Sequence, residues 1–268
     1  MVRAKKRLGQ HFLHHRAILE RIADALGPAP GDLVLEIGPG QGAFTSVLVE
    51  RGARVSAIEK DCNLAELVTE RVPHAHVVLG DALDLDWRQV AQAGPETPLL
   101  VTGNIPYQIT SPLLAKALEP PLPSRIVFLV QEEVADRLGA STGSAEYGAL
   151  SIGVQAIAEV EKLFRVSAGA FHPRPRVNSA VVRLTPRTAP LLSEPLRPLY
   201  RKLVVGLFGF RRKQLGRGLR ELTGWAPNEV NTVLTRAQAD PQSRPEALSP
   251  RAFVALLAAL IDAGWTPR

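Results

Sequence analysis

Short apolar runs alternate with segments of helical apolar spacing along the first half of the chain, and this alternation restricts the possible folds more than any other feature. The strand-like runs are residues 33–37, 54–58, 76–79, 99–101 and 126–130. Segments with helical spacing lie between them, at residues 44–49, 61–72 and 111–119. Strands that alternate with helices form parallel βαβ units. We therefore predict an α/β fold with a doubly wound parallel sheet.

The pattern changes towards the C-terminus, where strand-like runs end. Two helical segments, 132–138 and 146–157, precede two further strand candidates, 160–164 and 177–184, which could form a hairpin. Prolines then interrupt the chain at positions 186, 190, 195 and 198, and every later segment has helical spacing: 196–210, 212–222, 227–237 and 250–263. We predict a sheet-containing domain of residues 1–188, with residues 1–16 as a basic N-terminal arm, and a small all-helical domain of residues 189–268.

Positive charge is concentrated in three segments of this chain. The 268 residues have a formal net charge of +6. Residues 1–16, 171–187 and 200–220 together contain 16 basic residues and no acidic one, whereas the other 214 residues have a balance of −10. An acidic body with basic segments indicates a polyanionic partner, although a solvated helix face is the alternative for each run. The candidate RNA-binding residues are Lys5, Lys6, Arg7, Arg174, Arg176, Arg211, Arg212 and Lys213.

Composition and cysteine content exclude several classes of protein. Apolar residues make up 46% of the chain, too many for a disordered protein. The longest apolar run, residues 254–261, is far shorter than the ~20 residues that cross a bilayer, and no apolar segment follows the basic N-terminus as in a secretory signal. The single cysteine, Cys62, can form neither an internal disulfide nor a cysteine-rich zinc site. We expect a cytoplasmic protein without membrane association or metal.

Three features at the ends of predicted strands are typical of a nucleotide-containing ligand. Gly38 and Gly40 follow the first strand, where glycine lets the backbone turn tightly and approach a ligand. Glu59 ends the second strand, where an acid can accept hydrogen bonds from ribose hydroxyls. Asp81 follows the third strand, where it can contact an adenine amino group or cap a helix. A turn without a ligand and a dinucleotide site are the alternatives, although Ala43 stands where the dinucleotide fingerprint has its third glycine.

The segment Asn104-Ile105-Pro106-Tyr107, after the fourth strand, distinguishes between these possibilities. An exocyclic aromatic amine is a poor nucleophile because its lone pair is delocalised into the ring. The Asn104 side-chain oxygen and the Ile105 carbonyl can accept hydrogen bonds from its two N–H groups and free that lone pair. Pro106 helps to present the carbonyl, and Tyr107 can stack on the base, a contact worth ~1–3 kcal/mol. The segment predicts methyl transfer from a sulfonium donor, driven by positioning and electrostatics; a simple turn is the alternative.

Phe171 is a second candidate for stacking on the target base. It begins the segment Phe171-His172-Pro173-Arg174-Pro175, whose prolines would hold a rigid loop over the pocket. An isolated phenylalanine is also a good candidate for the apolar core. The flanking arginines and the lack of acids favour the functional interpretation.

Together these motifs resemble those of the ribosomal RNA adenine dimethyltransferases of the bacterial KsgA type. The likeness covers residues 8–184 and extends into the C-terminal domain at residues 210–215. The matching segments are Leu8-Gly9-Gln10-His11-Phe12-Leu13, Glu36-Ile37-Gly38-Pro39-Gly40, Ala57-Ile58-Glu59-Lys60-Asp61, Gly80-Asp81-Ala82, Asn104-Ile105-Pro106-Tyr107, Val130-Gln131-Glu132-Glu133-Val134 and Phe171-His172-Pro173-Arg174-Pro175-Arg176-Val177.

The resemblance implies a Rossmann-like domain that uses S-adenosyl-L-methionine (AdoMet) and releases S-adenosyl-L-homocysteine. It implies that Glu59 takes the ribose, that Asp81 takes the adenine amine and that Asn104 lies between cofactor and target. The full set of implied AdoMet contacts is His11, Leu13, Gly38, Glu59, Asp81 and Asn104, with Gly40 in the same glycine turn. The sequence departs from the family at position 11, often Asn, and at Gln41 and Gln108.

The resemblance also implies the substrate, which is two adjacent adenosines near the 3′ end of small-subunit (16S) ribosomal RNA in an immature 30S subunit. Each would become N6,N6-dimethyladenosine, and the target bases must be unstacked to enter the site. The family also implies a monomer.

Three other functions are weighed against this one. A methylase of large-subunit (23S) RNA that confers antibiotic resistance shares the cofactor motifs, but residues 210–215 favour the small-subunit enzyme. A non-catalytic RNA- or DNA-binding factor on the same fold would not need the intact Asn104, Pro106 and Tyr107. A dehydrogenase is the weakest alternative; it predicts binding of NAD, whereas we expect binding of AdoMet and none of NAD.

Overall fold

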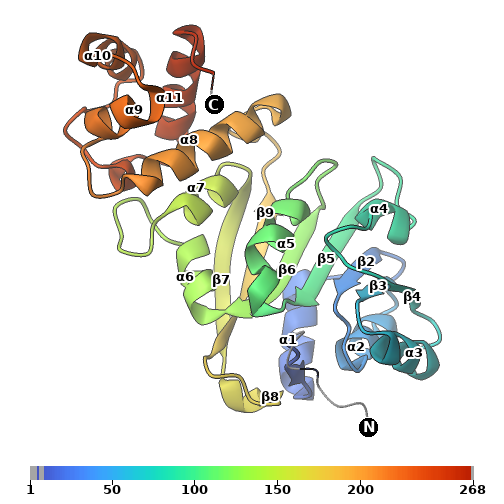
Figure 1. The fold of residues 1–268 in the computed structure, drawn as a ribbon. Helices are drawn as coiled ribbons and strands as arrows, with labels where there is room; N and C mark the ends of the chain where they lie inside the picture. Colours follow the sequence, from blue (N-terminus) through green and yellow to red (C-terminus); the bar gives the residue numbers. More distant parts are fainter. Residues whose placement is uncertain (1–4, 6–8, 267–268) are drawn as a thin grey trace. The chain divides into compact units, whose positions relative to one another are not determined.

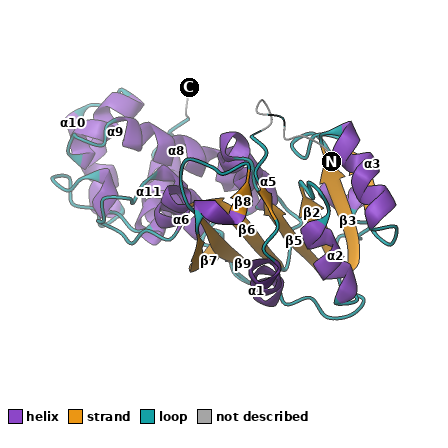
Figure 2. Cartoon of the chain, turned by 90° about the horizontal axis from the view of Figure 1, so that it is seen from below, coloured by secondary structure: helices purple, strands orange, loops and turns teal. Residues whose placement is uncertain are grey.

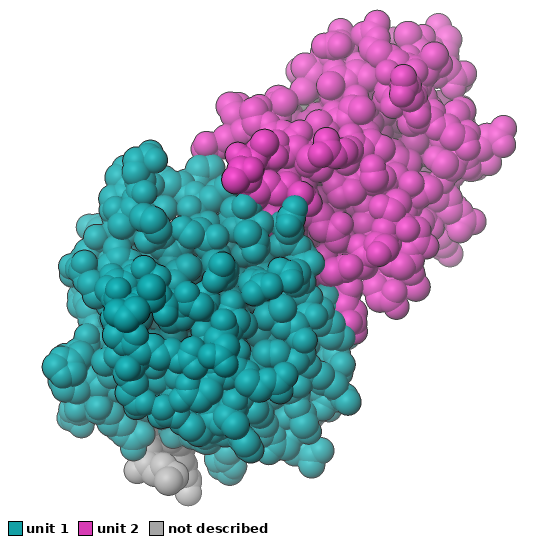
Figure 3. Space-filling model, turned by 180° about the vertical axis from the view of Figure 1, so that it is seen from behind, with its two compact units in different colours: residues 1–135, 159–186 teal, residues 136–158, 187–268 magenta. Residues whose placement is uncertain are grey.

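The computed structural model describes residues 5 and 9–266, which divide into two compact units. Unit 1 comprises residues 1–135 and 159–186, and unit 2 comprises residues 136–158 and 187–268 (Figures 1 and 3). No helix in the described part of the chain is long and apolar enough to cross a membrane.

Unit 1 is built on a seven-stranded sheet with the order β4-β3-β2-β5-β6-β9-β7. The chain leaves β2 towards β3 and β4, then returns to β5 on the other side of β2, so the strand order reverses between β2 and β5. In an open sheet of this kind, ligands bind at the carboxyl ends of the strands beside such a reversal. The strands are β2 (Leu33–Ile37), β3 (Arg54–Glu59), β4 (His76–Leu79), β5 (Leu99–Asn104), β6 (Arg125–Gln131), β7 (Ala158–Val166) and β9 (Ser179–Pro186).

The predicted doubly wound α/β sheet is confirmed, with one correction to its strand directions. The first five strands, β2 to β6, pair in parallel. The later strand β9 runs antiparallel to β6, with Ile126 opposite Leu184 and Gln131 opposite Ser179. No α-helix lies between β7 and β9, which follow each other closely in the chain and are neighbours in the sheet. The sheet is therefore mixed.

Helices α1 and α2 close an apolar core on one face of this sheet (Figure 2). Val34, Val127 and Leu129 contribute from the strands, and Leu19 and Leu48 from the two helices. The sequence analysis did not predict α1. The helices of this part of the chain are α1 (Arg16–Leu26), α2 (Ala43–Glu50), α3 (Cys62–Arg71), α4 (Trp87–Val90), α5 (Thr110–Ala117) and α6 (Glu132–Leu138).

A separate two-stranded sheet joins the N-terminal arm to the loop before β9. Its strands are β1 (Phe12–Leu13) and β8 (Phe171–His172), which pair antiparallel with Leu13 opposite Phe171. Neither strand was predicted, because a two-residue strand has no periodicity to detect. This pairing brings segments about 160 residues apart together in unit 1.

Unit 2 is helical, as predicted, but its boundary differs from the predicted one at residues 189–268. Its helices are α7 (Ala149–Gln155), α8 (Arg197–Gly209), α9 (Leu215–Thr223), α10 (Pro227–Arg236) and α11 (Pro250–Asp262). Residues 136–158, which we had assigned to the sheet domain, belong to unit 2. The reason is packing, since the buried side chains of Tyr147 and Ile152 share one apolar cluster with Tyr200, Leu203 and Phe253.

Candidate functional site

A cavity of about 190 Å³ opens at the carboxyl ends of β2, β3, β4 and β5. Each of these strands supplies one of the predicted features to its wall. The lining includes Gly38 and Gly40, Glu59, Asp81, and Asn104 to Tyr107. The N-terminal arm completes the wall with Gly9, Gln10, His11 and Phe12. The topology therefore gathers most of the predicted site residues, although they are spread over about 100 positions of the sequence.

Backbone N–H groups fix the Glu59 carboxylate in place at the end of β3. Oε2 accepts a hydrogen bond from the Gly40 N–H at 3.2 Å, and Oε1 accepts one from the Asp61 N–H at 2.9 Å. Burial raises the pKa of Glu59, while these N–H groups act in the opposite direction. Gly40 has a φ of 58°, and a Cβ there would come within 3.0 Å of the Phe12 ring. Glycine is therefore required where the turn, the arm and Glu59 meet.

Asp81 both shapes its own turn and lines the cavity. Its Oδ1 accepts a hydrogen bond from the Leu83 N–H at 3.0 Å, and its Oδ2 accepts one from the Lys60 ammonium. Lys60, and then the Leu83 N–H, keep the pKa of Asp81 below its usual value. Asp81 therefore stabilises its own turn, the alternative to a ligand contact in the sequence analysis, and also lies in the cavity wall.

The segment from Asn104 to Tyr107 presents two hydrogen-bond acceptors at the end of β5. The Asn104 Nδ2 donates to the His11 carbonyl oxygen at 2.7 Å. Ile105 is held through its own N–H, which donates to the Leu129 carbonyl at 3.0 Å. The Asn104 Oδ1 and the Ile105 carbonyl accept no hydrogen bond from any described residue. Two acceptors on adjacent residues are therefore available to a ligand.

Gly103 lets β5 carry Asn104 into this position. A Cβ at Gly103 would lie 2.5 Å from the Ile37 carbonyl oxygen of the neighbouring strand. Such a contact is too close for any other residue, so β5 and β2 can approach here because position 103 is glycine.

Tyr107 is anchored beside these acceptors by its hydroxyl. The hydroxyl lies 3.0 Å from the Ser179 Oγ at the start of β9. Burial raises the pKa of Tyr107, and the hydrogen bond to Ser179 opposes this. The ring faces His11, with ring centroids 5.8 Å apart and planes inclined by 27°. Ser179 is a supporting residue that the sequence analysis missed, because it lies 72 positions from Tyr107.

A network centred on Asp61 holds the N-terminal arm against the cavity. The Asp61 carboxylate accepts hydrogen bonds from the Lys5 Nζ at 2.6 Å and from the Gln10 Nε2 at 3.2 Å, and it caps α3 through the Asn63 N–H. Burial acts to raise the pKa of Asp61, but these three donors outweigh it and the pKa is lowered. Lys5, predicted to bind RNA, is therefore in a salt bridge inside the protein. Lys6 and Arg7 lie outside the described residues.

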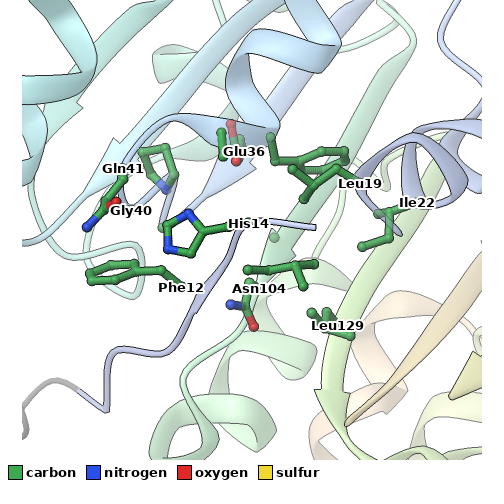
Figure 4. A pocket seen from close by; sticks show the side chains of 15 residues that line it. Phe12, His14, Leu19, Ile22, Glu36, Gly40, Gln41, Asn104 and Leu129 are labelled. Carbon is green, nitrogen blue, oxygen red and sulfur yellow. The ribbon is translucent and has the colours of Figure 1, made fainter. Parts of the chain in front are cut away.

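A second cavity adjoins the first and shares Phe12, Gly38, Gly40 and Asn104 with it. Figure 4 shows Glu36 and Asn104 among its lining residues. Burial raises the pKa of Glu36 to about 7, against a hydrogen bond of 2.7 Å that Thr45 Oγ1 donates to it. The sequence analysis gave Glu36 no role of its own, although an acid inside an apolar strand is a signal of one.

Two of the predicted site residues are not in the main cavity. Leu13 is buried in the core and lines the second cavity instead. Phe171 is 5% exposed, packs in the core with Leu19 and Val181, and lines neither of these cavities. The pairing of β1 with β8 places Leu13 opposite Phe171, and both side chains join the core. In this structure Phe171 therefore follows the core alternative and does not face the site.

The remaining basic candidates differ in how many partners they have. Arg174 and Arg176 are exposed in the segment after β8, and no described acid pairs with either. In unit 2, Lys213 lies 2.6 Å from Glu221, while Arg211 donates to the Ala145 carbonyl and lies 3.8 Å from Glu246. Arg212 is exposed. The run 211–213 is therefore partly engaged inside unit 2.

Comparison with known proteins places this arrangement in a family. Residues 1–256 match the family model described as "Ribosomal RNA adenine dimethylase". The "Ribosomal RNA small subunit methyltransferase A" of Acinetobacter baylyi is 40% identical over 95% of this chain and 91% of its own. The protein of the same name from Pseudomonas aeruginosa is 41% identical over 95% of this chain and 93% of its own.

Two solved structures share the fold of this chain over nearly its whole length. A dimethyladenosine transferase from Plasmodium falciparum superposes with a TM-score of 0.82 and 27% identity, covering 95% of this chain and 98% of its own. The 23S rRNA methyltransferase ErmE superposes with a TM-score of 0.71 and 28% identity, covering 93% of this chain and 99% of its own.

Proposed function

Because the chain belongs to the ribosomal RNA adenine dimethylase family, we propose that it transfers methyl groups from AdoMet to N6 of two adjacent adenosines near the 3′ end of small-subunit ribosomal RNA. Each adenosine becomes N6,N6-dimethyladenosine. The observation that carries this proposal is a pair of acceptors at the end of β5, Asn104 Oδ1 and the Ile105 carbonyl, which receive no hydrogen bond from the described residues. They lie in the wall of the cavity that also contains the carboxylates of Glu59 and Asp81.

The chemistry of the cavity wall fits AdoMet. The Glu59 carboxylate would accept hydrogen bonds from the ribose hydroxyls, and the Asp81 carboxylate would accept one from the adenine amino group. Gly38 and Gly40 have no side chains to obstruct a close approach to the backbone, and a Cβ at Gly40 would press on the Phe12 ring. His11 of the N-terminal arm would complete the binding surface, whereas Leu13 lines the second cavity. When bound, AdoMet supplies a methyl group that its sulfonium centre has already activated.

In the proposed mechanism, the residues at the end of β5 activate the target amine. Asn104 Oδ1 and the Ile105 carbonyl accept hydrogen bonds from the two N–H groups of N6, which draws the nitrogen towards tetrahedral geometry and frees its lone pair. Pro106, with a φ of −56°, helps to fix the direction of the carbonyl. Tyr107 stacks on the base and holds it in place. Positioning and electrostatics provide most of the rate. The nitrogen carries a positive charge once the methyl group is bonded to it, and it then releases one of its N–H protons to water, so no strong base is required.

The second transfer uses the same groups on a changed substrate. The mono-methylated amine keeps one N–H, so one of the two acceptors suffices to orient it. The amine has to return to the cavity after S-adenosyl-L-homocysteine has been replaced by fresh AdoMet. We therefore expect mono-methylated adenosine to accumulate when cofactor exchange is slowed.

The substrate is proposed to reach the site as part of an immature 30S subunit, bound by a monomer of this protein. The exposed Arg174 and Arg176 would contact phosphates of the RNA. Arg211, Arg212 and Lys213 would add contacts from unit 2, with Arg212 the most available of the three.

Large-subunit RNA is the competing substrate, because the fold also matches a 23S rRNA methyltransferase. The experiment is methyl incorporation from labelled AdoMet into immature small subunits and into large-subunit RNA, followed by mapping of the modified base. We expect label in small-subunit RNA, on two adjacent adenosines near the 3′ end. Label only in large-subunit RNA would contradict the proposal.

The role of the acceptors is tested by Asn104→Ala. Because a group that stabilises the transition state is worth about 100-fold to 1,000-fold in rate, kcat should fall by that factor. A matched control is Asn231→Ala on the exposed face of α10, which should leave kcat unchanged. Unchanged methyl transfer by Asn104→Ala would exclude the proposed mechanism.

A further inference from the structure

We propose that His11 is a positioning residue that connects the target loop, defined as residues 171–176, to Asn104 and so fixes the carboxamide that receives the target amine. The inference rests on the proposed function, in which Asn104 Oδ1 accepts a hydrogen bond from N6. It goes beyond the family likeness, which implies only that His11 contacts AdoMet. Three contacts of His11, made to three different segments, support it.

The first contact orients the Asn104 side chain. The His11 carbonyl oxygen lies 2.7 Å from the Asn104 Nδ2. A carbonyl oxygen can only accept, so this partner selects the amide nitrogen of Asn104 and excludes the flipped carboxamide, which would place two oxygens in contact. The flip would also replace Oδ1, the acceptor, with a donor. The backbone position of His11 therefore decides which atom Asn104 presents to the target.

The second contact fixes that backbone position through the His11 side chain. The His11 Nδ1 lies 2.7 Å from the Pro173 carbonyl oxygen. This bond requires a proton on Nδ1, because the carbonyl has none to give. The arm is already paired with the target loop one residue further on, where Phe12 lies opposite His172. The imidazole thus adds a contact between the arm and the loop at His11, the residue whose carbonyl holds Asn104.

The third contact places the His11 ring against Tyr107. The ring centroids are 5.8 Å apart and the planes are inclined by 27°. The other side of this arrangement is fixed as well, because the Tyr107 hydroxyl bonds to Ser179. His11 therefore contacts the stacking residue and the acceptor residue at once, while the attachment of its side chain to the loop depends on Nδ1.

Through these contacts, the position of the target loop can influence the position of Asn104, which binds the reacting amine. Arg174 and Arg176 are exposed on the loop and have no acidic partner among the described residues, so the loop is well suited to contact phosphates. A shift of the Pro173 carbonyl would be transmitted by His11 to Asn104. The rate of methyl transfer, more than the affinity for AdoMet, should therefore depend on the His11 side chain.

The test compares two substitutions that separate the ring from its hydrogen bond. His11→Phe keeps an aromatic ring beside Tyr107 and removes the Nδ1–H donor. His11→Asn removes the ring but places an amide nitrogen at the position of Nδ1, two bonds from Cβ. The measurements are kcat for methyl transfer to immature small subunits, the AdoMet Kd by calorimetry and the melting temperature of each variant.

We expect kcat of His11→Phe to fall about tenfold to a hundredfold, because a displacement of ~1 Å costs up to about a hundredfold in rate. The AdoMet Kd should stay within about threefold, and His11→Asn should retain a higher kcat than His11→Phe. The matched control is His15→Phe, since His15 is exposed and its side chain makes no cap hydrogen bond. This control should behave like the wild type.

Three results would overturn the inference. One is a kcat of His11→Phe within about twofold of the wild type. Another is a rise in the AdoMet Kd as large as the fall in kcat, which would make His11 a cofactor contact and no more. The third is a kcat of His11→Asn no higher than that of His11→Phe. This comparison is valid even if a variant is less stable than the wild type, as long as it is folded at the assay temperature. If Asn104→Ala is inactive while His11→Phe is fully active, the proposed function stands and the positioning role alone fails.

Discussion

The two sides of the main cavity differ in how far the protein satisfies its own polar groups. On the cofactor side, Glu59 already accepts hydrogen bonds from two backbone N–H groups, and Asp81 accepts hydrogen bonds from a backbone N–H and from the Lys60 ammonium. On the target side, Asn104 Oδ1 and the Ile105 carbonyl have no donor among the described residues. An acceptor without a partner costs free energy when it is removed from water. The difference identifies the end of β5 as the place in the cavity wall where the donors of a ligand find acceptors that no described residue occupies.

This contrast separates a binding role from a catalytic one. A carboxylate fixed by N–H groups keeps its position whether or not a ligand is bound, so it suits recognition of the cofactor. A free acceptor that meets its donor only in the complex can stabilise the activated amine. We therefore expect substitutions on the cofactor side to change Kd, and substitutions on the target side to change kcat.

The largest effect on the cofactor side is expected for Glu59→Gln. The charged acceptor for the ribose hydroxyls is removed, and a hydrogen bond to a charged group is worth about 1.5–3 kcal/mol, which corresponds to about a tenfold to hundredfold rise in the AdoMet Kd. At saturating AdoMet, kcat should stay within about threefold. Calorimetry and steady-state kinetics measure the two quantities. Glu70→Gln, on the exposed side of α3, is the control. A loss confined to kcat would contradict the division between the two sides.

The next effect concerns stability and pH, through Glu36 beneath the glycine turn. Its folded pKa of about 7 lies above the value of 4.5 expected in the unfolded chain. Between these values the unfolded chain loses a proton that the folded protein keeps, so stability falls as pH rises from about 4.5 through 7, by ~3 kcal/mol in total. Glu36→Gln should remove this slope while keeping an acceptor for Thr45. Urea unfolding at pH 5 and pH 8 gives the free energy of unfolding of the wild type and of Glu36→Gln. If both proteins lose the same stability between the two pH values, the effect is excluded.

A smaller effect is expected for the arginines that contact RNA. Replacing Arg174 and Arg176 by Ala should weaken RNA binding several-fold. The slope of the logarithm of the binding constant against the logarithm of the salt concentration should become shallower by about one for each phosphate that the variant no longer binds. Arg211→Ala with Arg212→Ala should act in the same direction but less, because Arg211 is partly engaged with Ala145 and Glu246. Binding measured between low and high salt gives the slope. Neither pair should change the AdoMet Kd, and an equal loss of both affinities would show that the arginines are structural.

The smallest effect is expected for Tyr107→Phe. The ring remains available for stacking, while the hydrogen bond of 3.0 Å to Ser179 is removed. We expect kcat to fall about threefold, since a neutral hydrogen bond contributes ~0.5–1.5 kcal/mol. Tyr107→Ala, which also removes the stacking surface, should lower kcat much further. If the two variants are equally impaired, the hydroxyl and not the ring is the important group.

Much of the fold and of the cofactor side followed from local pattern. Strands β2 and β4 were predicted to the residue, at positions 33–37 and 76–79. The first is buried along its whole length, as expected of an apolar run inside a parallel sheet. The second lies partly exposed at the edge of the sheet and was recognised by its run of Val77, Val78 and Leu79. Glu59, Asp81 and Asn104 were recognisable because each directly follows or ends such a run, and the ends of parallel strands meet at one edge. The strands β1 and β8 and the helix α1 were not predicted, because their apolar periodicity did not reveal them.

Long-range packing decided what local pattern could not. Phe171 and Leu13 face the core because β1 pairs with β8, and residues 136–158 belong to unit 2 because Tyr147 and Ile152 pack with α8 and α11. The partners of the basic residues are equally non-local, as in Lys5 with Asp61 and Arg211 with Glu246.

The sequence by itself determined the doubly wound sheet, the order of its first five strands along the chain and the chemical groups at their ends. These depend on apolar periodicity and on residue type, which are local properties. The tertiary structure alone decided which acceptors have no donor in the described part of the chain, which cations are paired, and that His11 joins Asn104, Tyr107 and Pro173. Such contacts join residues up to 162 positions apart, so they arise only when burial of the apolar strands and helices has brought those segments together.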